Sequence, residues 1–121
     1  MKQGKIMNAY HALSRLYIQP LPIKEAYKIF GLRKQLDDQY KFEIDREKQS
    51  LEQTGGYIDE DGEIRFRIKE NAKKFTAAIN ELSEMEVDIQ IKPITIKMDE
   101  LADLKITPVD IEYLDGFVVF E

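Results

Sequence analysis

The fold is decided by residues 23–52, which read IKEAYKIFGLRKQLDDQYKFEIDREKQSLE. Apolar side chains recur along this stretch at the three- and four-residue spacing of an α-helix. Pro20 and Pro22 separate it from the preceding segment, and Gly55-Gly56 ends it. At about 1.5 Å per residue the helix would be roughly 45 Å long, which is long for a chain of this size. We therefore expect the other elements to be arranged along this one helix.

The same spacing predicts which face of the long helix is buried. The expected stripe consists of Ile23, Ala26, Tyr27, Ile29 and Phe30, followed by Leu36, Tyr40, Ile44 and Leu51. Arg33 and Glu47 interrupt it. Three apolar residues, Phe30, Leu32 and Phe42, need cover beyond one seam, so a further surface has to contact this helix.

Two shorter helices are predicted beside the long one. Residues 5–17 carry an apolar face formed by Ile6, Tyr10, Leu13 and Tyr17. Residues 68–85 carry a heptad stripe formed by Ile68, Ala72, Phe75, Ile79 and Leu82. We expect the helix over 68–85 to pack antiparallel on the second half of the long helix, and the helix over 5–17 to cover the first half.

A short β-hairpin is predicted between the long helix and the helix over 68–85. Residues 57–66 hold the turn pair Asp61-Gly62 between apolar residues. A three-residue loop with Gly62 in the left-handed region places Ile58 opposite Ile64, whereas a two-residue turn pairs Ile58 with Arg65. The three-residue loop is preferred because it gathers the apolar side chains on one face.

The last 35 residues change in character. Val87, Ile89 and Ile91 alternate with polar residues, which indicates a half-buried strand. Thr107-Pro108 predicts a short helix over 108–114, and residues 117–120 predict a closing strand. The expected fold is α+β, a single domain over residues 1–121: a long antiparallel helical hairpin, a short β-hairpin at its tip, and a strand and short-helix segment over 87–121.

Composition excludes several classes of protein. The chain has 121 residues and no cysteine, which leaves room for one domain and none for disulfides or thiolate metal sites. No apolar run reaches the roughly 20 residues of a membrane span, and the first residues lack a signal-peptide core, so a cytoplasmic protein is expected. Residues 1–58 carry a small basic excess, while residues 81–121 carry eleven acidic and three basic side chains. The basic excess is too small for direct nucleic-acid binding to be expected.

The residues of common active sites are missing from the sequence. No glycine-rich phosphate loop occurs, and His11 is the one histidine, beside an apolar stripe where a surface role is expected. Clusters such as Glu43, Asp45 and Glu47 are expected on solvated faces, where acid–base chemistry has no support. The sequence therefore predicts no catalytic residue, no cofactor, no metal site and no enzymatic activity.

Aromatic residues provide the candidate interaction surface instead. Tyr27, Phe30, Tyr40 and Phe42 lie on or beside the stripe of the long helix. Tyrosine is common at interfaces because it joins a large apolar ring to a polar tip. These residues are either boundary residues of an ordinary core or part of a surface for a protein partner, including a homodimer along the long helix.

Several motifs carry a resemblance to a known family. The motifs are LPIKEAYKI at residues 21–29, Asp61-Gly62, INEL at residues 79–82, VDI at residues 87–89 and ITPVDI at residues 106–111. In this organisation the chain resembles small proteins of unknown function encoded by tailed phages and prophages of Gram-positive bacteria. The resemblance spans nearly the whole chain and supplies no catalytic residues. It implies a phage or prophage origin and a role in an infected cell or a virion.

The expected function is therefore that of a non-enzymatic phage accessory protein that binds another protein, in virion assembly or in takeover of the host. The alternative is an inhibitor of a host nuclease or defence protein. In that interpretation the acidic residues of 81–121 imitate the charge of a nucleic acid, although Lys92, Lys97 and Lys105 interrupt the acidity.

Overall fold

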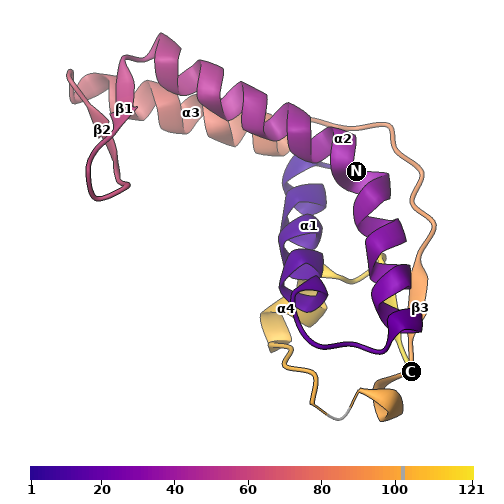
Figure 1. Ribbon diagram of the computed structural model, residues 1–121. Coiled ribbons are helices and arrows are strands. Elements are labelled where there is room, and N and C mark those ends of the chain that lie inside the picture. Colours follow the sequence, from indigo (N-terminus) through magenta and orange to yellow (C-terminus); the bar gives the residue numbers. More distant parts are fainter. Residues whose placement is uncertain (102) are drawn as a thin grey trace.

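The computed structural model describes residues 1–101 and 103–121 and shows an angular molecule with two parts (Figure 1). The elements are α1 (Gln3–Tyr17), α2 (Ile23–Gln53), β1 (Gly56–Ile58), β2 (Ile64–Phe66), α3 (Glu70–Glu84), β3 (Ile94–Ile96), the 3₁₀ turn η1 (Met98–Glu100), α4 (Pro108–Tyr113) and β4 (Val118–Phe120). We call α1, the first half of α2, β3, β4 and α4 the head. The second half of α2, β1, β2 and α3 form the arm. The α+β class predicted from the sequence is confirmed.

The core lies in the head, between α1 and the first half of α2. Its largest fully buried members are Ile6, Leu13 and Leu16 from α1, Ile29, Leu32 and Leu36 from α2, and Ile96, Leu114 and Phe117 from the C-terminal segment. The predicted stripe of α2 is wrong at its start, because Ile23 and Tyr27 are exposed. The continuous face at spacings of four, three and four is Glu25, Ile29, Leu32 and Leu36.

Glu25 occupies the first position of that buried face and is held there by a lysine. Lys28 Nζ lies 3.3 Å from the Glu25 carboxylate and 3.0 Å from the Thr95 carbonyl oxygen, to which it donates. The lysine thus joins α2 to β3. A buried carboxylate is tolerated when it is paired in this way.

The long helix α2 changes direction near its middle, where the head meets the arm (Figure 1). Gln3, fully buried at the start of α1, donates from Nε2 to the main-chain carbonyl oxygen of Gln39 at 3.0 Å. A side chain that competes for a helical carbonyl is a known cause of helix bending. The bend therefore coincides in sequence with the contact between α1 and the middle of α2.

The arm is two helices thick. α3 lies beside the second half of α2 (Figure 1), and none of its described residues is buried. β1 and β2 pair antiparallel with Ile58 opposite Ile64, which is the register predicted for the three-residue loop. Gly62 has a φ of 79°, and the Asp59 carboxylate accepts hydrogen bonds from the Asp61 and Glu63 N–H groups. These local bonds fix the loop.

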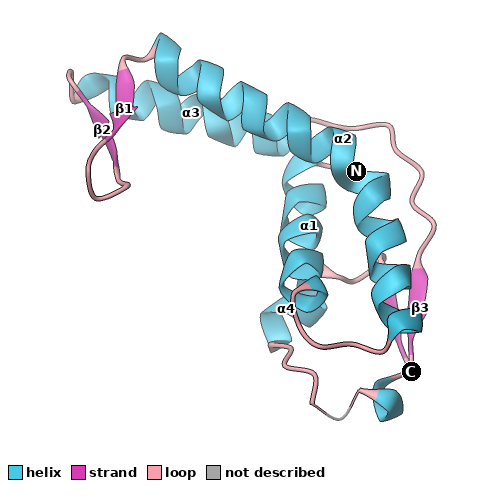
Figure 2. Cartoon of the chain, viewed as in Figure 1, coloured by secondary structure: helices cyan, strands magenta, loops and turns pink. Residues whose placement is uncertain are grey.

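The segment after α3 is mostly loop (Figure 2). The strand predicted over 87–91 is wrong, because these residues form no strand. The predicted alternation is present: Val87, Ile89 and Ile91 are half-buried and pack against the core. Further along, Gln35 of α2 replaces a strand partner: it accepts from the Lys92 N–H at 2.9 Å and donates to the Lys92 carbonyl oxygen at 3.3 Å. The Gln35 side chain thus satisfies both main-chain groups of Lys92, and no β-ladder forms at this residue.

The C-terminal residues close the base of the head. β3 and β4 pair in parallel, with Ile94 opposite Val118. Thr107 caps α4 by accepting a hydrogen bond from the Asp110 N–H, as the sequence predicts. The Asp110 carboxylate accepts two hydrogen bonds from Arg15, and these fix α4 against α1.

Candidate functional site

A row of stacked side chains runs along the seam between α1 and α2. The Arg33 guanidinium carbon lies 4.7 Å from the ring centre of Tyr17 and 5.3 Å from that of Tyr10. Tyr10 also stacks on Tyr40, with ring centres 4.2 Å apart and planes 14° apart. Cation–π contacts and offset stacking of this kind hold side chains in fixed positions. The seam therefore presents a preorganised surface.

Tyr27 and Phe30 extend this row toward the start of α2. Their ring centres are 6.1 Å apart, and the two side chains are 73% and 43% exposed. We call the six residues Tyr10, Tyr17, Tyr27, Phe30, Arg33 and Tyr40 the aromatic row. Its exposed end therefore lies at Tyr27 and Phe30, and its partly buried end at Tyr40.

Two shallow depressions adjoin each other on the row and share Phe30. The first has a volume of about 300 Å³ and is lined by apolar side chains, among them Leu21, Ile23 and Tyr27. The second, of about 220 Å³, is lined by Phe30, Arg33 and Lys34, together with Tyr10 and Asp37. The first depression offers an apolar surface, and the second offers the positive charges of Arg33 and Lys34 beside it.

The positive charge of the second depression is available to a ligand. Among the side chains that the structure describes, no carboxylate lies within ion-pair distance of Arg33 or Lys34. Asp37, the acid beside them, pairs with Lys41 at 3.7 Å. Arg33 is held between two rings and donates to the Tyr10 hydroxyl at 3.3 Å, so its position is set before any ligand arrives.

The structure divides the four residues of the predicted interaction surface. Tyr27, Phe30 and Tyr40 belong to the aromatic row, with Tyr40 at its partly buried end. Phe42 does not, because it lies on the arm, in a groove between α2 and α3. Arg33, which the sequence pattern treats only as an interruption of the seam, joins the two halves of the row.

A signal for Arg33 exists in the sequence. Tyr10 and Tyr17 are seven residues apart on α1, and Arg33 and Tyr40 are seven apart on α2. Seven residues are two helical turns, so each pair projects from one face. Where the two helices pack together, Arg33 and Tyr40 of α2 lie beside Tyr10 and Tyr17 of α1. The sequence alone does not show that the helices pack at these positions.

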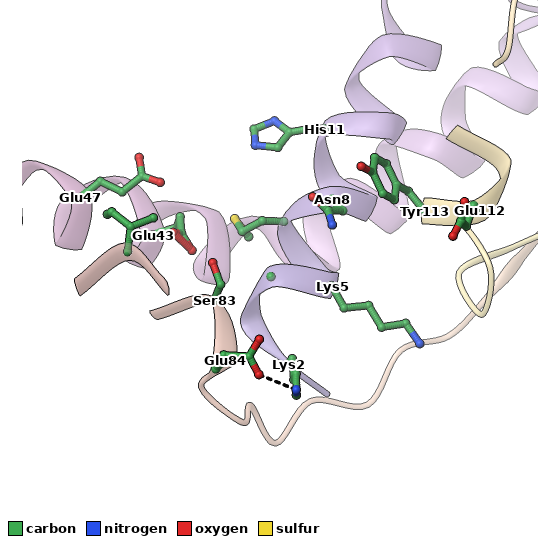
Figure 3. Close-up of a pocket in the computed structure, with 13 residues that line it drawn as sticks. Lys2, Lys5, Asn8, His11, Glu43, Glu47, Ser83, Glu84, Glu112 and Tyr113 are labelled. Carbon is green, nitrogen blue, oxygen red and sulfur yellow. Dashed lines mark hydrogen bonds and ion pairs between the residues drawn. The ribbon is translucent and has the colours of Figure 1, made fainter. Parts of the chain in front are cut away.

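A further hollow lies where α1, the middle of α2, the end of α3 and α4 meet (Figure 3). Its volume is about 560 Å³. Its polar lining includes Lys5, Asn8, His11, Glu47 and Ser83. Figure 3 shows that these side chains spread along the hollow and do not point at one spot. The hollow therefore offers a polar surface without an assembled acid–base pair.

Glu43 borders this hollow, and the prediction that it lies on a solvated face is wrong. Its side chain is buried, because α1 and α3 both lie against this part of α2. Burial raises the pKa of the Glu43 carboxyl, the hydrogen bond from Gln3 Nε2 at 3.3 Å opposes that rise, and the charge of Glu47 adds to it. The position thus carries a carboxyl group whose charge costs stability.

The hollow has one ion pair among the residues that the structure describes. Lys2 pairs with Glu84 across its open edge (Figure 3), and this contact raises the pKa of Lys2. His11 is exposed, as predicted, and meets the Tyr40 ring edge-on with centres 6.3 Å apart. The Lys2–Glu84 pair thus joins the residue before α1 to the last residue of α3.

Comparison with protein-family models, with curated proteins and with solved structures gives no match to this chain. None of the described helices combines the length and the apolar character of a membrane span. In the described part of the chain, no group of three or more histidine, aspartate or glutamate side chains is arranged to hold a metal ion.

Proposed function

We propose that this chain is a non-enzymatic accessory protein that binds a partner protein through the aromatic row. The observation that carries the proposal is the pair of adjacent depressions on either side of Phe30, one apolar and one cationic. Tyrosine, phenylalanine and arginine are enriched at protein interfaces, and tyrosine and arginine are frequent among the residues that contribute most to binding. The row gathers them on one preorganised face.

The two depressions define the chemistry of the partner. An apolar or aromatic side chain of the partner fits against Tyr27 in the first depression. A carboxylate that follows at short spacing reaches Arg33 and Lys34 in the second. An amphipathic helix with acidic residues beside its apolar face has both groups at the required spacing, and the partner is therefore an acidic amphipathic segment.

The resemblance to phage and prophage proteins supports a setting for this binding. An infected cell or an assembling virion offers such partners, and the same resemblance supports a cytoplasmic location in the host. The proposal assigns the chain no catalytic step, since the polar side chains that line the hollow between α1 and α3 do not converge on one spot.

The alternative of a nucleic-acid mimic has less support. It depends on the acidic residues of 81–121 facing solvent as a group. Asp110 is buried against Arg15, and Glu84 is paired with Lys2, so neither offers its charge to a basic partner. Binding through the aromatic row involves one or two charge pairs, so its affinity should fall only slightly as the salt concentration rises. A steep fall in affinity with salt would favour the nucleic-acid mimic instead.

The test uses short displayed peptides selected on the immobilised protein. We expect the selected peptides to share an apolar anchor and an acidic residue within one helical turn of it. Each substitution Tyr27→Ala and Arg33→Gln should weaken their binding about tenfold or more, as for other interface anchors. Tyr57→Ala, at an exposed tyrosine on the arm, is the matched control and should leave binding unchanged.

Two results would contradict the proposal. Selected peptides that lack acidic residues would remove the role of Arg33 and Lys34. Peptides that bind the Tyr27→Ala variant as tightly as the parent protein would remove the aromatic row from the interface.

A further inference from the structure

The arm carries a groove between α2 and α3. It has a volume of about 390 Å³, and its lining includes Phe42, Arg46 and Ser50 from α2 and Ala78, Glu81 and Leu82 from α3. Phe42 is 41% exposed there. We call this depression the arm groove. It is independent of the aromatic row, which lies on the head.

The arm lacks the cover that a free-standing helix pair needs. None of the described residues of α3 is buried, although its apolar face is well defined. The positions of α2 that face α3 and α1 include Glu43 and Ser50, which are polar, while Phe42 and Ile44 are exposed. Two helices in contact along one seam bury too little apolar surface to be stable alone, so another surface must cover the arm.

The charges beside the groove indicate what covers it. Arg46 and Glu81 line the same depression from opposite helices. Within the described residues neither forms an ion pair, and Arg46 donates to its neighbour Gln49 at 2.7 Å. A two-fold axis between the two side chains brings Arg46 of each copy to Glu81 of the other. Such a contact is self-complementary.

The charge order along α3 points the same way. Glu70 lies in its first turn, Lys73 and Lys74 follow, and Glu81 and Glu84 lie in its last turn, where no basic residue occurs. The acidic last turn opposes the helix macrodipole, which favours basic residues near the end of a helix. Lys74, Ala78 and Glu81 share one face at spacings of four and three. In an antiparallel pair of α3 helices, Lys73 and Lys74 of each copy lie toward Glu81 and Glu84 of the other.

We propose that the arm groove is the interface of a two-fold homodimer, with Phe42 and Leu82 at its apolar centre and the Arg46–Glu81 pairs on either side. The occupant of each groove is thus the arm of a second copy. Two helix pairs packed face to face form a four-helix bundle, in which the apolar face of α3 is covered by the second copy.

The test is a charge swap between copies, followed by sedimentation equilibrium. The parent protein should have twice the 14.2 kDa chain mass. Arg46→Glu and Glu81→Arg should each weaken dimerisation about tenfold or more, because each places like charges together twice. Mixing the two variants should restore a dimer of mixed composition. In that dimer the two substituted side chains face each other with opposite charges, and the native Arg46 of one copy meets the native Glu81 of the other.

The mixing step separates the proposal from a structural role inside one chain. Charges that matter only within a monomer are not repaired by adding a second variant. Val109→Glu, at an exposed apolar position on α4, is the control and should stay dimeric. Circular dichroism should show unchanged helix content in every variant. A parent protein that remains monomeric, or a mixture that fails to associate, overturns the proposal.

Discussion

The contact between Arg15 and Asp110 allows a quantitative test of how the head is held together. The Asp110 carboxylate accepts from Arg15 Nε at 3.0 Å and from a second guanidinium nitrogen. The Asp110 side chain is 7% exposed and that of Arg15 is 49% exposed. Hydrogen bonds to charged groups contribute about 1.5–3 kcal/mol each. Because water screens the half-exposed arginine, we expect Asp110→Asn to lower the free energy of unfolding by about 2 kcal/mol in total.

The pH dependence of this loss follows from the pKa of Asp110. The hydrogen bonds from Arg15 lower that pKa below the ordinary value of 3.8, against the effect of burial. The contribution of Asp110 is therefore fully present above pH 3.8 and disappears as the pH falls through the lowered value. Asp110→Asn should be less stable than the parent at neutral pH, and the gap should close in acid.

Urea unfolding followed by circular dichroism measures both effects. Glu112→Gln, at an exposed acid on the same short helix, is the control and should change stability by less than about 0.5 kcal/mol. A neutral-pH difference below that limit would refute the assignment of Arg15–Asp110 as the link between α1 and α4. A difference that persists unchanged in acid would show that the carboxylate charge is not its source.

Three further predictions concern single positions. Glu43→Gln should stabilise the fold at neutral pH, because burial raises the pKa of Glu43, and the gain should vanish below pH 4.5, as urea titrations at both pH values can check. Gly31→Ala should stabilise by about 1 kcal/mol in α2, whereas Gly62→Ala, at a φ of 79°, should destabilise by about 1 kcal/mol; equal signs in thermal melts would contradict this. Leu13→Ala should cost about 2–5 kcal/mol in urea unfolding, while exposed Ile18→Ala should cost less than about 0.5 kcal/mol.

The features that the sequence predicts well depend on neighbouring residues. The β1–β2 register follows from a positive φ at Gly62, and the start of α4 follows from the capping oxygen of Thr107. Both are decided within a few residues. The helical periodicity of α2 is local in the same sense, and its predicted length agrees with Ile23–Gln53.

The buried face of α2 could not be predicted, because it depends on what packs against it. The sequence pattern assigns Ile44 to the seam and Glu43 to solvent, and the structure has the reverse. The reason is Gln3 of α1, which offers the Glu43 carboxylate a hydrogen bond inside the junction. A polar pair between residues 40 positions apart leaves no periodic signal. Arg33 escapes prediction as a site residue for the same reason, since its two aromatic neighbours come from α1.

The two proposed surfaces share one helix, and this has a consequence for binding. Phe30 and Arg33 lie on the first half of α2, and Phe42 and Arg46 on the second. A dimer formed through the arm groove therefore carries two aromatic rows at fixed positions on continuous helices. A partner that repeats its acidic segment, as the subunits of a symmetric assembly do, can engage both rows at once, and the second contact then forms at a high effective concentration. A weak contact at each row is thus sufficient for stable binding to a repeated partner, whereas an isolated copy of that partner is released.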